Sequence, residues 1–127
     1  MGEVEHISAV TFAVRDMARS VAFYRKLGFS IFYGGEYASF SSFRFGEACV
    51  NLAASSSYEG QAWGRVIFRV TDADTYRKLL TAAGLEPDEP KDAAWGERFF
   101  HVLDPDGHEL SFAQLLIQGT TPAELEG

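Results

Sequence analysis

The sequence repeats itself once, and this duplication limits the folds that the chain can adopt. The run from Val10 to Asp16 recurs 56 residues later as the run from Val66 to Asp72, with Val, Phe, Val and Asp at the same spacing. In both copies a helix-like stretch follows, and it ends at a glycine, Gly28 in the first copy and Gly84 in the second. The two halves are therefore expected to form the same structural unit.

Each copy reads as a strand followed by a capped helix. In both opening runs apolar residues occupy alternate positions, which indicates a strand with one buried face. Asp16 and Asp72 come next and are expected to cap the helices, and Gly28 and Gly84 to end them. The predicted buried stripes of the helices are Val21, Tyr24 and Leu27 in the first copy and Tyr76, Leu79, Leu80 and Ala83 in the second.

Further strands are predicted after each helix. In the first copy they cover residues 30–33, 38–45 and 48–53; in the second they comprise a short strand near Leu85 and strands at 98–103 and 109–115, the last two joined by the turn from Asp104 to Gly107. We therefore predict an α+β fold of two tandem β-α-β-β-β modules, at about residues 6–54 and 63–116. The modules should form a curved mixed sheet around a cleft, with helices on the outer face, in one domain covering residues 1–127. The tail, residues 117–127, reads as a short helix or a frayed end.

Charge and composition exclude several classes of partner. The net charge of −7 and the lack of a Lys/Arg cluster argue against nucleic acid and anionic membranes. No apolar run is long enough to span a bilayer, and the acidic N-terminus does not resemble a signal peptide. The single cysteine, Cys49, cannot form an internal disulfide and fits a reducing compartment, so we expect a cytoplasmic protein.

Two segments carry a resemblance to a known family. The segment 16–29, with Ser20, Phe23 and Tyr24 after its capping Asp, looks like the first-module signature of the vicinal oxygen chelate superfamily. The segment 95–110 looks like the final hairpin of that superfamily. Together with the duplication, the resemblance covers about residues 6–116. The superfamily includes glyoxalases, bleomycin-resistance proteins and extradiol dioxygenases. Such members are isomerases, dioxygenases, thiol transferases or non-catalytic drug binders, and they commonly form homodimers.

The resemblance also implies where a metal would be held. Metal-dependent members take a His from the first strand of each module, seven residues before the capping Asp, and a Glu from the last strand, four residues after the hairpin Gly. These positions hold Ala9, Arg65 and Ser111 here, and Asn51 lies in the corresponding strand of the first copy. A methyl group cannot ligate, a guanidinium repels a cation, and a hydroxyl and an amide are weak donors. We therefore expect no metal and no other cofactor.

Strand alternation and the resemblance together predict the face that lines the cleft. Arg65 and Arg69 can pair with a carboxylate or phenolate of a ligand, or be neutralised by protein carboxylates such as Glu97. Trp63 and Trp95 can stack on a planar ligand or pack in the protein. The candidate ligand-binding residues are Ala9, Thr11, Asn51, Trp63, Arg65, Arg69, Trp95, Phe99, His101 and Ser111.

The histidines leave the chemistry open. His101 reads as a ligand contact, a buried structural residue or a general base, and it is the one candidate catalytic residue. His108 lies on the final turn, where we expect a solvated side chain. The favoured function is metal-free binding of a small molecule in the cleft, which sequesters a drug or metabolite as bleomycin-resistance proteins do. The alternatives are a metal-dependent lyase, isomerase or dioxygenase with non-standard ligands, and a metal-free enzyme that uses His101 and the two arginines.

Overall fold

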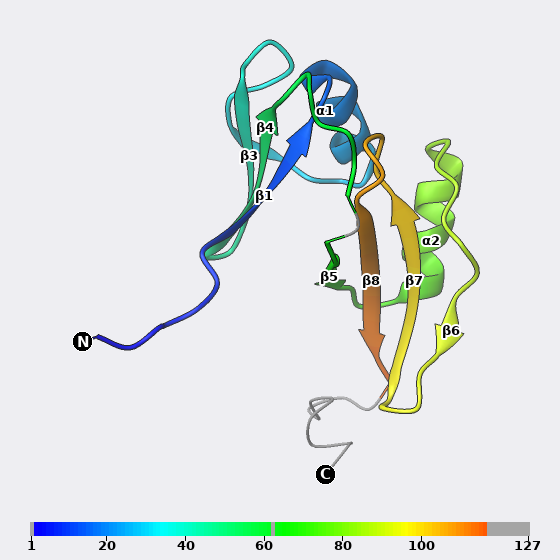
Figure 1. Cartoon of the computed structure of the whole chain (residues 1–127). Helices are drawn as coiled ribbons and strands as arrows, with labels where there is room; N and C mark the ends of the chain where they lie inside the picture. Colours follow the sequence, from blue (N-terminus) through cyan, green and yellow to red (C-terminus); the bar gives the residue numbers. More distant parts are fainter. Residues whose placement is uncertain (1, 62, 117–127) are drawn as a thin grey trace. The chain divides into compact units, whose positions relative to one another are not determined.

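The computed structural model describes residues 2–61 and 63–116 and divides the chain into two compact units, with the boundary after residue 61 (Figure 1). The first unit contains β1 (Ala9–Val14), α1 (Met17–Lys26), β2 (Ile31–Tyr33), β3 (Phe40–Phe45) and β4 (Ala48–Ala54). The second contains β5 (Arg65–Arg69), α2 (Ala73–Ala82), β6 (Lys91–Asp92), β7 (Glu97–Leu103) and β8 (Glu109–Leu115). Both units follow the predicted β-α-β-β-β order.

Each unit folds around one mixed sheet of four strands. The strand order is β1-β4-β3-β2 in the first unit and β5-β8-β7-β6 in the second. In both, the opening strand pairs in parallel with the last one, and the remaining pairs are antiparallel. The identical topology confirms the α+β fold of two tandem modules.

The helices begin and end at the predicted residues. Asp16 accepts a hydrogen bond from the backbone N–H of Arg19 at 3.1 Å, and Asp72 accepts one from Thr75 at 3.0 Å. Such capping satisfies an amide that has no partner inside the helix. Gly28 and Gly84, just beyond the helices, have φ of +93° and +92°, which favours glycine.

Apolar side chains fill the space between each helix and one face of its sheet. In the first unit Tyr24 of α1 is fully buried, with its ring 5.7 Å from that of Phe43 of β3. In the second unit the ring of Tyr76 of α2 lies 4.9 Å from that of Phe112 of β8. Burial raises the pKa of Tyr76, because it disfavours the charged phenolate. The helices therefore cover one face of each sheet and leave the other face open.

Three predictions about single residues of the second unit are wrong. Leu79 does not belong to the buried stripe of α2: it is 63% exposed, whereas its neighbour Leu80 is 1% exposed, because a helix of ten residues buries only a narrow stripe. There is no short strand near Leu85 among the described residues, since the N–H of Leu85 bonds to the carbonyl of Leu80 and closes the helix. The short strand is β6, which pairs with β7.

The third is His108, which is buried at 4% exposure rather than solvated. Asp104 Oδ1 accepts the backbone N–H groups of both Asp106 and His108 at 2.9 Å, which folds the turn inward. The short helix or frayed end expected for residues 117–127 lies outside the described residues. Within the described part of the chain, neither helix has the length and apolarity that crossing a bilayer requires.

Candidate ligand site on the second unit

The open face of the second sheet gathers most of the predicted site residues. Strand alternation turns Arg65, Ile67 and Arg69 of β5 to this face, away from α2. The register places Ile67, Ser111 and His101 in one row across β5, β8 and β7. The next row consists of Arg69, Ala113 and Phe99.

A hollow lies over these rows. The predicted residues that line it come from all three strands and from the turn before β7. Ile67, Glu97 and Ala113 also line it. Strand alternation predicts Ile67 and Ala113 on this face, although neither is among the candidate ligand-binding residues, and Glu97 was expected only as a possible partner of the arginines. The full lining is Arg65, Ile67, Trp95, Glu97, Phe99, His101, Ser111 and Ala113.

Aromatic rings form one side of the hollow. The indole of Trp95 and the ring of Phe99 are nearly parallel, at 15°, with centroids 6.4 Å apart. The ring of Phe99 lies 5.3 Å from that of His101. This succession offers ring faces to a planar molecule.

His101 and Ser111 form a polar pair at the middle of the floor. The Ser111 hydroxyl lies 2.6 Å from His101 Nδ1, and Ser111 itself is buried. The backbone N–H of His101 donates to Asp88 at 2.6 Å, which fixes this part of β7. The pair can donate or accept a hydrogen bond, since a hydroxyl and an imidazole each do both.

Glu97 is a nearly buried carboxylate with partners on both oxygens. Its side chain is 11% exposed. Trp95 Nε1 donates to Oε1 at 2.7 Å, and Arg69 Nη2 donates to Oε2 at 3.1 Å. Arg69 is therefore paired with a protein carboxylate, the second of the two interpretations of this arginine.

Arg65 also has a partner, but in a different environment. Its Nη1 lies 3.3 Å from Glu109 Oε2, and both side chains are well exposed. Exposed pairs of this kind contribute little to stability, because water and salt screen them. The guanidinium of Arg65 therefore lies at the edge of the hollow and is accessible to solvent.

Trp63 has a structural contact. Its Nε1 donates to His108 Nδ1 at 3.0 Å, which ties the start of the second unit to the turn between β7 and β8. In the described structure neither Trp63 nor Arg69 lines the hollow. Of the two tryptophans predicted to stack on a ligand, Trp95 lines the hollow and Trp63 does not.

The predicted residues of the first unit lie on the open face of the first sheet. Thr11 pairs in register with Asn51, and Asn51 Nδ2 donates to Thr11 Oγ1 at 3.2 Å. Ser42 Oγ donates to Asn51 Oδ1 at 2.7 Å. Ala9 lies on the same face, two residues before Thr11. The side chains of Thr11, Asn51 and Ser42 thus bond to one another, while Arg44, two residues along β3 from Ser42, shares this face and lies over the ring of Phe32.

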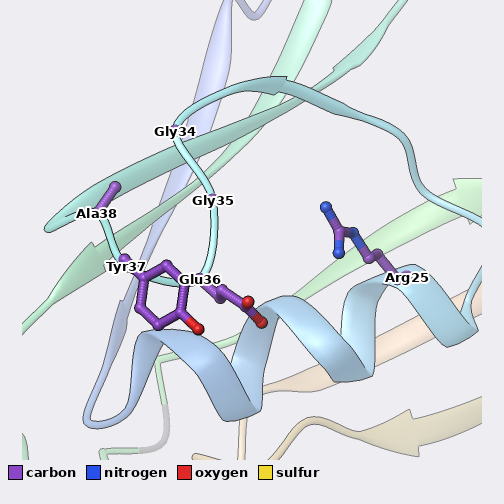
Figure 2. Close-up of a pocket in the computed structure, with 6 residues that line it drawn as sticks. All are labelled: Arg25, Gly34, Gly35, Glu36, Tyr37 and Ala38. Atoms are coloured by element: carbon purple, nitrogen blue, oxygen red, sulfur yellow. The ribbon is translucent and has the colours of Figure 1, made fainter.

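Sequence reasoning gave no sign of a second hollow, located on the first unit between α1 and the loop that joins β2 to β3. Figure 2 shows Glu36 and Tyr37 extending from the loop toward the helix, and Arg25 extending from the helix. The loop is fixed by Ser41, whose Oγ accepts the N–H of Gly35 and donates to its carbonyl, both at 3.0 Å. The remaining lining residues are Gly34, Gly35 and Ala38.

The residues at the implied metal positions do not fit a divalent ion. In the second unit these positions hold the guanidinium of Arg65 and the hydroxyl of Ser111, which is engaged by His101. In the first unit they hold a methyl group and an amide whose oxygen accepts from Ser42. Among residues 2–61 and 63–116, no three His, Cys, Asp or Glu side chains form a group able to hold a metal.

Comparison with solved structures finds the same fold in proteins of different activity. A bleomycin resistance determinant encoded on transposon Tn5 shares 20% identity, with a TM-score of 0.74 over 89% of this chain and 100% of that one. A bleomycin-binding protein solved with bleomycin shares 21%, with a TM-score of 0.71 over 87% and 98%. A lactoylglutathione lyase from Agrobacterium tumefaciens shares 16%, with a TM-score of 0.74 over 94% and 100%.

At these identities the likeness establishes the fold alone. A search of curated proteins finds no significant match. A sequence model of one family does match, over residues 6–112. That span includes both capped helices, all of β7 and the first four residues of β8. The chain belongs to the Glyoxalase/Bleomycin resistance protein/Dioxygenase superfamily.

Proposed function

We propose that this protein binds a small planar organic molecule, without a metal, in the hollow on the open face of the second sheet. The observation that carries the proposal is the arrangement of Trp95, Phe99 and His101 beside a floor of small and apolar residues. Binding pockets for small molecules combine apolar and aromatic walls with a few polar groups that orient the ligand. Here Arg65 and the pair of His101 and Ser111 supply those groups.

The donor chemistry favours binding over metal-dependent catalysis. A guanidinium and an engaged hydroxyl stand where metal-dependent members place ligands. A structure with this fold is that of a bleomycin-binding protein with its ligand, so the fold supports binding as a function in itself. The role that follows is sequestration of a drug or metabolite, and we expect the protein to act in the cytoplasm.

A titration with planar aromatic compounds, including planar antibiotics, tests the proposal. Trp95 lines the hollow, so its fluorescence should change on binding, and calorimetry gives the affinity independently. Ile67→Gln should weaken binding of an uncharged planar compound by about tenfold, because the compound would cover an amide without a partner. Leu79→Gln is the matched control, since Leu79 is similarly exposed but lies on α2. An absence of binding across a broad panel, or equal losses in both variants, would refute the proposed site.

We also expect a homodimer, as members of the superfamily commonly form. Exposed aromatic side chains on and beside β2, including Phe32, Tyr33 and Tyr37, give the first unit apolar surface for a partner. Sedimentation equilibrium over a range of protein concentrations measures the assembly directly. A monomer at all concentrations would contradict the expectation without affecting the ligand site.

A further inference from the structure

Two opposite charges stand at opposite ends of the hollow. The register defines four successive rows on the open face: Arg65 with Glu109, Ile67 with Ser111, Arg69 with Ala113, and Leu115 with Glu97. Arg65 therefore lies in the first row and Glu97 in the fourth. Because a strand rises about 3.3 Å per residue and each row is two residues further on, the backbones of Arg65 and Glu97 are roughly 20 Å apart along the strands.

Both charged groups face the hollow, whereas their partners do not. Within residues 63–116, Arg65 and Glu97 line the hollow, but Glu109 and Arg69 are not among the lining residues. The Glu97 carboxylate accepts one hydrogen bond on each oxygen, and a carboxylate has room for about four. Arg65 has five N–H groups and a weak, exposed pairing with Glu109. Each end of the hollow can therefore bind one more charged group.

The surface between the two ends is mainly apolar. Ile67, Ala113 and Phe99 form its floor and side, and His101 with Ser111 forms the polar step at its centre. A ligand that covers this surface removes water from both ends. Arg65 keeps Glu109 as its partner, and Glu97 keeps Arg69. A ligand with charge at only one end would therefore desolvate the opposite ion pair without adding a charge to it, which is costly.

From this arrangement we propose that the hollow is built for an elongated, planar zwitterion, with its carboxylate at Arg65 and its ammonium at Glu97. The inference rests on the proposed function and names the ligand class for the same site. The flat middle of the ligand stacks beside Trp95 and Phe99. The two charged ends set its direction, because reversing the ligand would bring like charges together at both ends.

A set of four rigid biphenyl compounds tests the inference. They carry at their para ends an aminomethyl group, which is an ammonium at neutral pH, and a carboxylate, the carboxylate alone, the aminomethyl group alone, or neither, and their affinities for the unmodified chain are compared by calorimetry at neutral pH. The zwitterion should bind at least about tenfold more tightly than any of the other three, which corresponds to about 1.4 kcal/mol. This comparison needs no variant, so it stays decisive even where a substitution unfolds the protein.

Two variants assign the ends. In Arg65→Gln, adding the carboxylate to the compound should no longer raise its affinity, whereas adding the ammonium should still do so. Glu97→Gln should do the reverse, since the amide keeps an oxygen for the Trp95 N–H but loses the charge. Arg77→Gln, which removes a cation of α2 that pairs with Glu89, should leave the order unchanged.

The binding site and its preference for a zwitterion are refuted by different results. Equal binding of all four compounds, still weakened by Ile67→Gln, would overturn the zwitterion and leave the binding site in place. Binding by none of the four would overturn both. A preference for the zwitterion that persists in Arg65→Gln and in Glu97→Gln would also overturn the inference, because the charges would then act elsewhere.

Discussion

At the scale of single residues, Glu97 shapes the proposed site more than any other side chain. It reaches Arg69 of β5 although β8 lies between their strands, and the β8 residue in the row of Arg69 is Ala113. A larger residue at 113 would stand in the path of the Arg69 side chain. Through its other oxygen Glu97 holds the Trp95 indole, so one carboxylate fixes both an ion pair and the aromatic wall.

A pair of glycine substitutions tests how tightly the loop beside α1 is built. Gly34 and Gly28 both have positive φ, so an alanine at either position should cost about 1 kcal/mol from backbone strain alone. A Cβ at Gly34 would lie 2.3 Å from the carbonyl oxygen of Phe40, whereas one at Gly28 would meet nothing within 4 Å. Urea unfolding should therefore show Gly34→Ala to be less stable than Gly28→Ala by about 1–3 kcal/mol. Equal losses would contradict the packing of this loop.

Strand alternation predicted which residues share the open face, but not which side chains bond there. It placed Arg65, Phe99, His101 and Ser111 together correctly, because side-chain direction in a strand depends only on parity. The sequence named Glu97 as a possible partner of Arg65 or Arg69, but it could not select Arg69, because that pairing depends on the strand order β5-β8-β7, which pattern alone does not determine. His108 was misjudged for a similar reason: its burial follows from contacts with Asp104 and Trp63.

At the scale of elements, α2 is held to its sheet through a narrow apolar stripe. Leu80 is buried, whereas Leu79 is largely exposed. Leu80→Ala should lower the free energy of unfolding by about 2–5 kcal/mol, since it leaves a cavity in the core. Leu79→Ala should change it by no more than about 0.5 kcal/mol. Chemical denaturation of the two variants measures both changes. Similar losses of unfolding free energy would mean that Leu79 packs in the core as the sequence predicted.

Arg98 of β7 links three elements of the second unit through charge. Its Nε lies 3.0 Å from Asp74 of α2, and its Nη1 lies 2.8 Å from Asp92 of β6. The hydrogen bond from Arg98 holds the pKa of Asp74 below its usual value of 3.8. Because Asp74 titrates at lower pH in the folded chain than in the unfolded one, the pair stabilises the fold above that range. This contribution is lost as pH falls through the folded-state pKa.

An NMR titration that follows the Asp74 carboxyl carbon tests the link. In the unmodified protein its midpoint should lie below 3.8, and in Arg98→Leu it should return toward that value. Arg98→Lys, which keeps the positive charge, should retain part of the depression. A midpoint that is the same in all three proteins would show that Arg98 does not control Asp74.

Local signals predicted the helices well and the smallest strand poorly. Asp16 and Asp72 indicate where the helices start, because capping depends only on a side chain and the backbone amides close to it in sequence. The two-residue strand β6 carries no such signal, since Lys91 and Asp92 are strand residues only through pairing with Phe99 and Arg98.

At the scale of the whole molecule, one scaffold carries two different open faces. The equivalent rows hold Thr11, Asn51 and Ser42 in the first sheet and Ile67, Ser111 and His101 in the second. The side chains of the first row hydrogen-bond to one another, whereas the second row lines a hollow that has aromatic and charged residues at its borders. Duplication accounts for the shared topology, and the different residues on the two open faces account for placing the proposed site on the second sheet.

Metal content is a property of the whole chain and can be measured without knowing the ligand. Protein purified without chelators should contain well under one equivalent of zinc, nickel, manganese or iron by elemental analysis, because the implied ligand positions carry poor donors. Dialysis against EDTA should leave the unfolding midpoint unchanged. A stoichiometric ion whose removal lowers that midpoint would favour a metal-dependent enzyme with other ligands.

The central claim is that the open face of the second sheet is where this protein binds a small molecule without a metal. A titration with the biphenyl zwitterion in the presence of EDTA, followed by backbone amide NMR, tests this most directly. The largest shifts should fall on residues 65–69, 95–101 and 111–113. Shifts concentrated instead around Arg25 and residues 34–38, or binding abolished by EDTA, would contradict it.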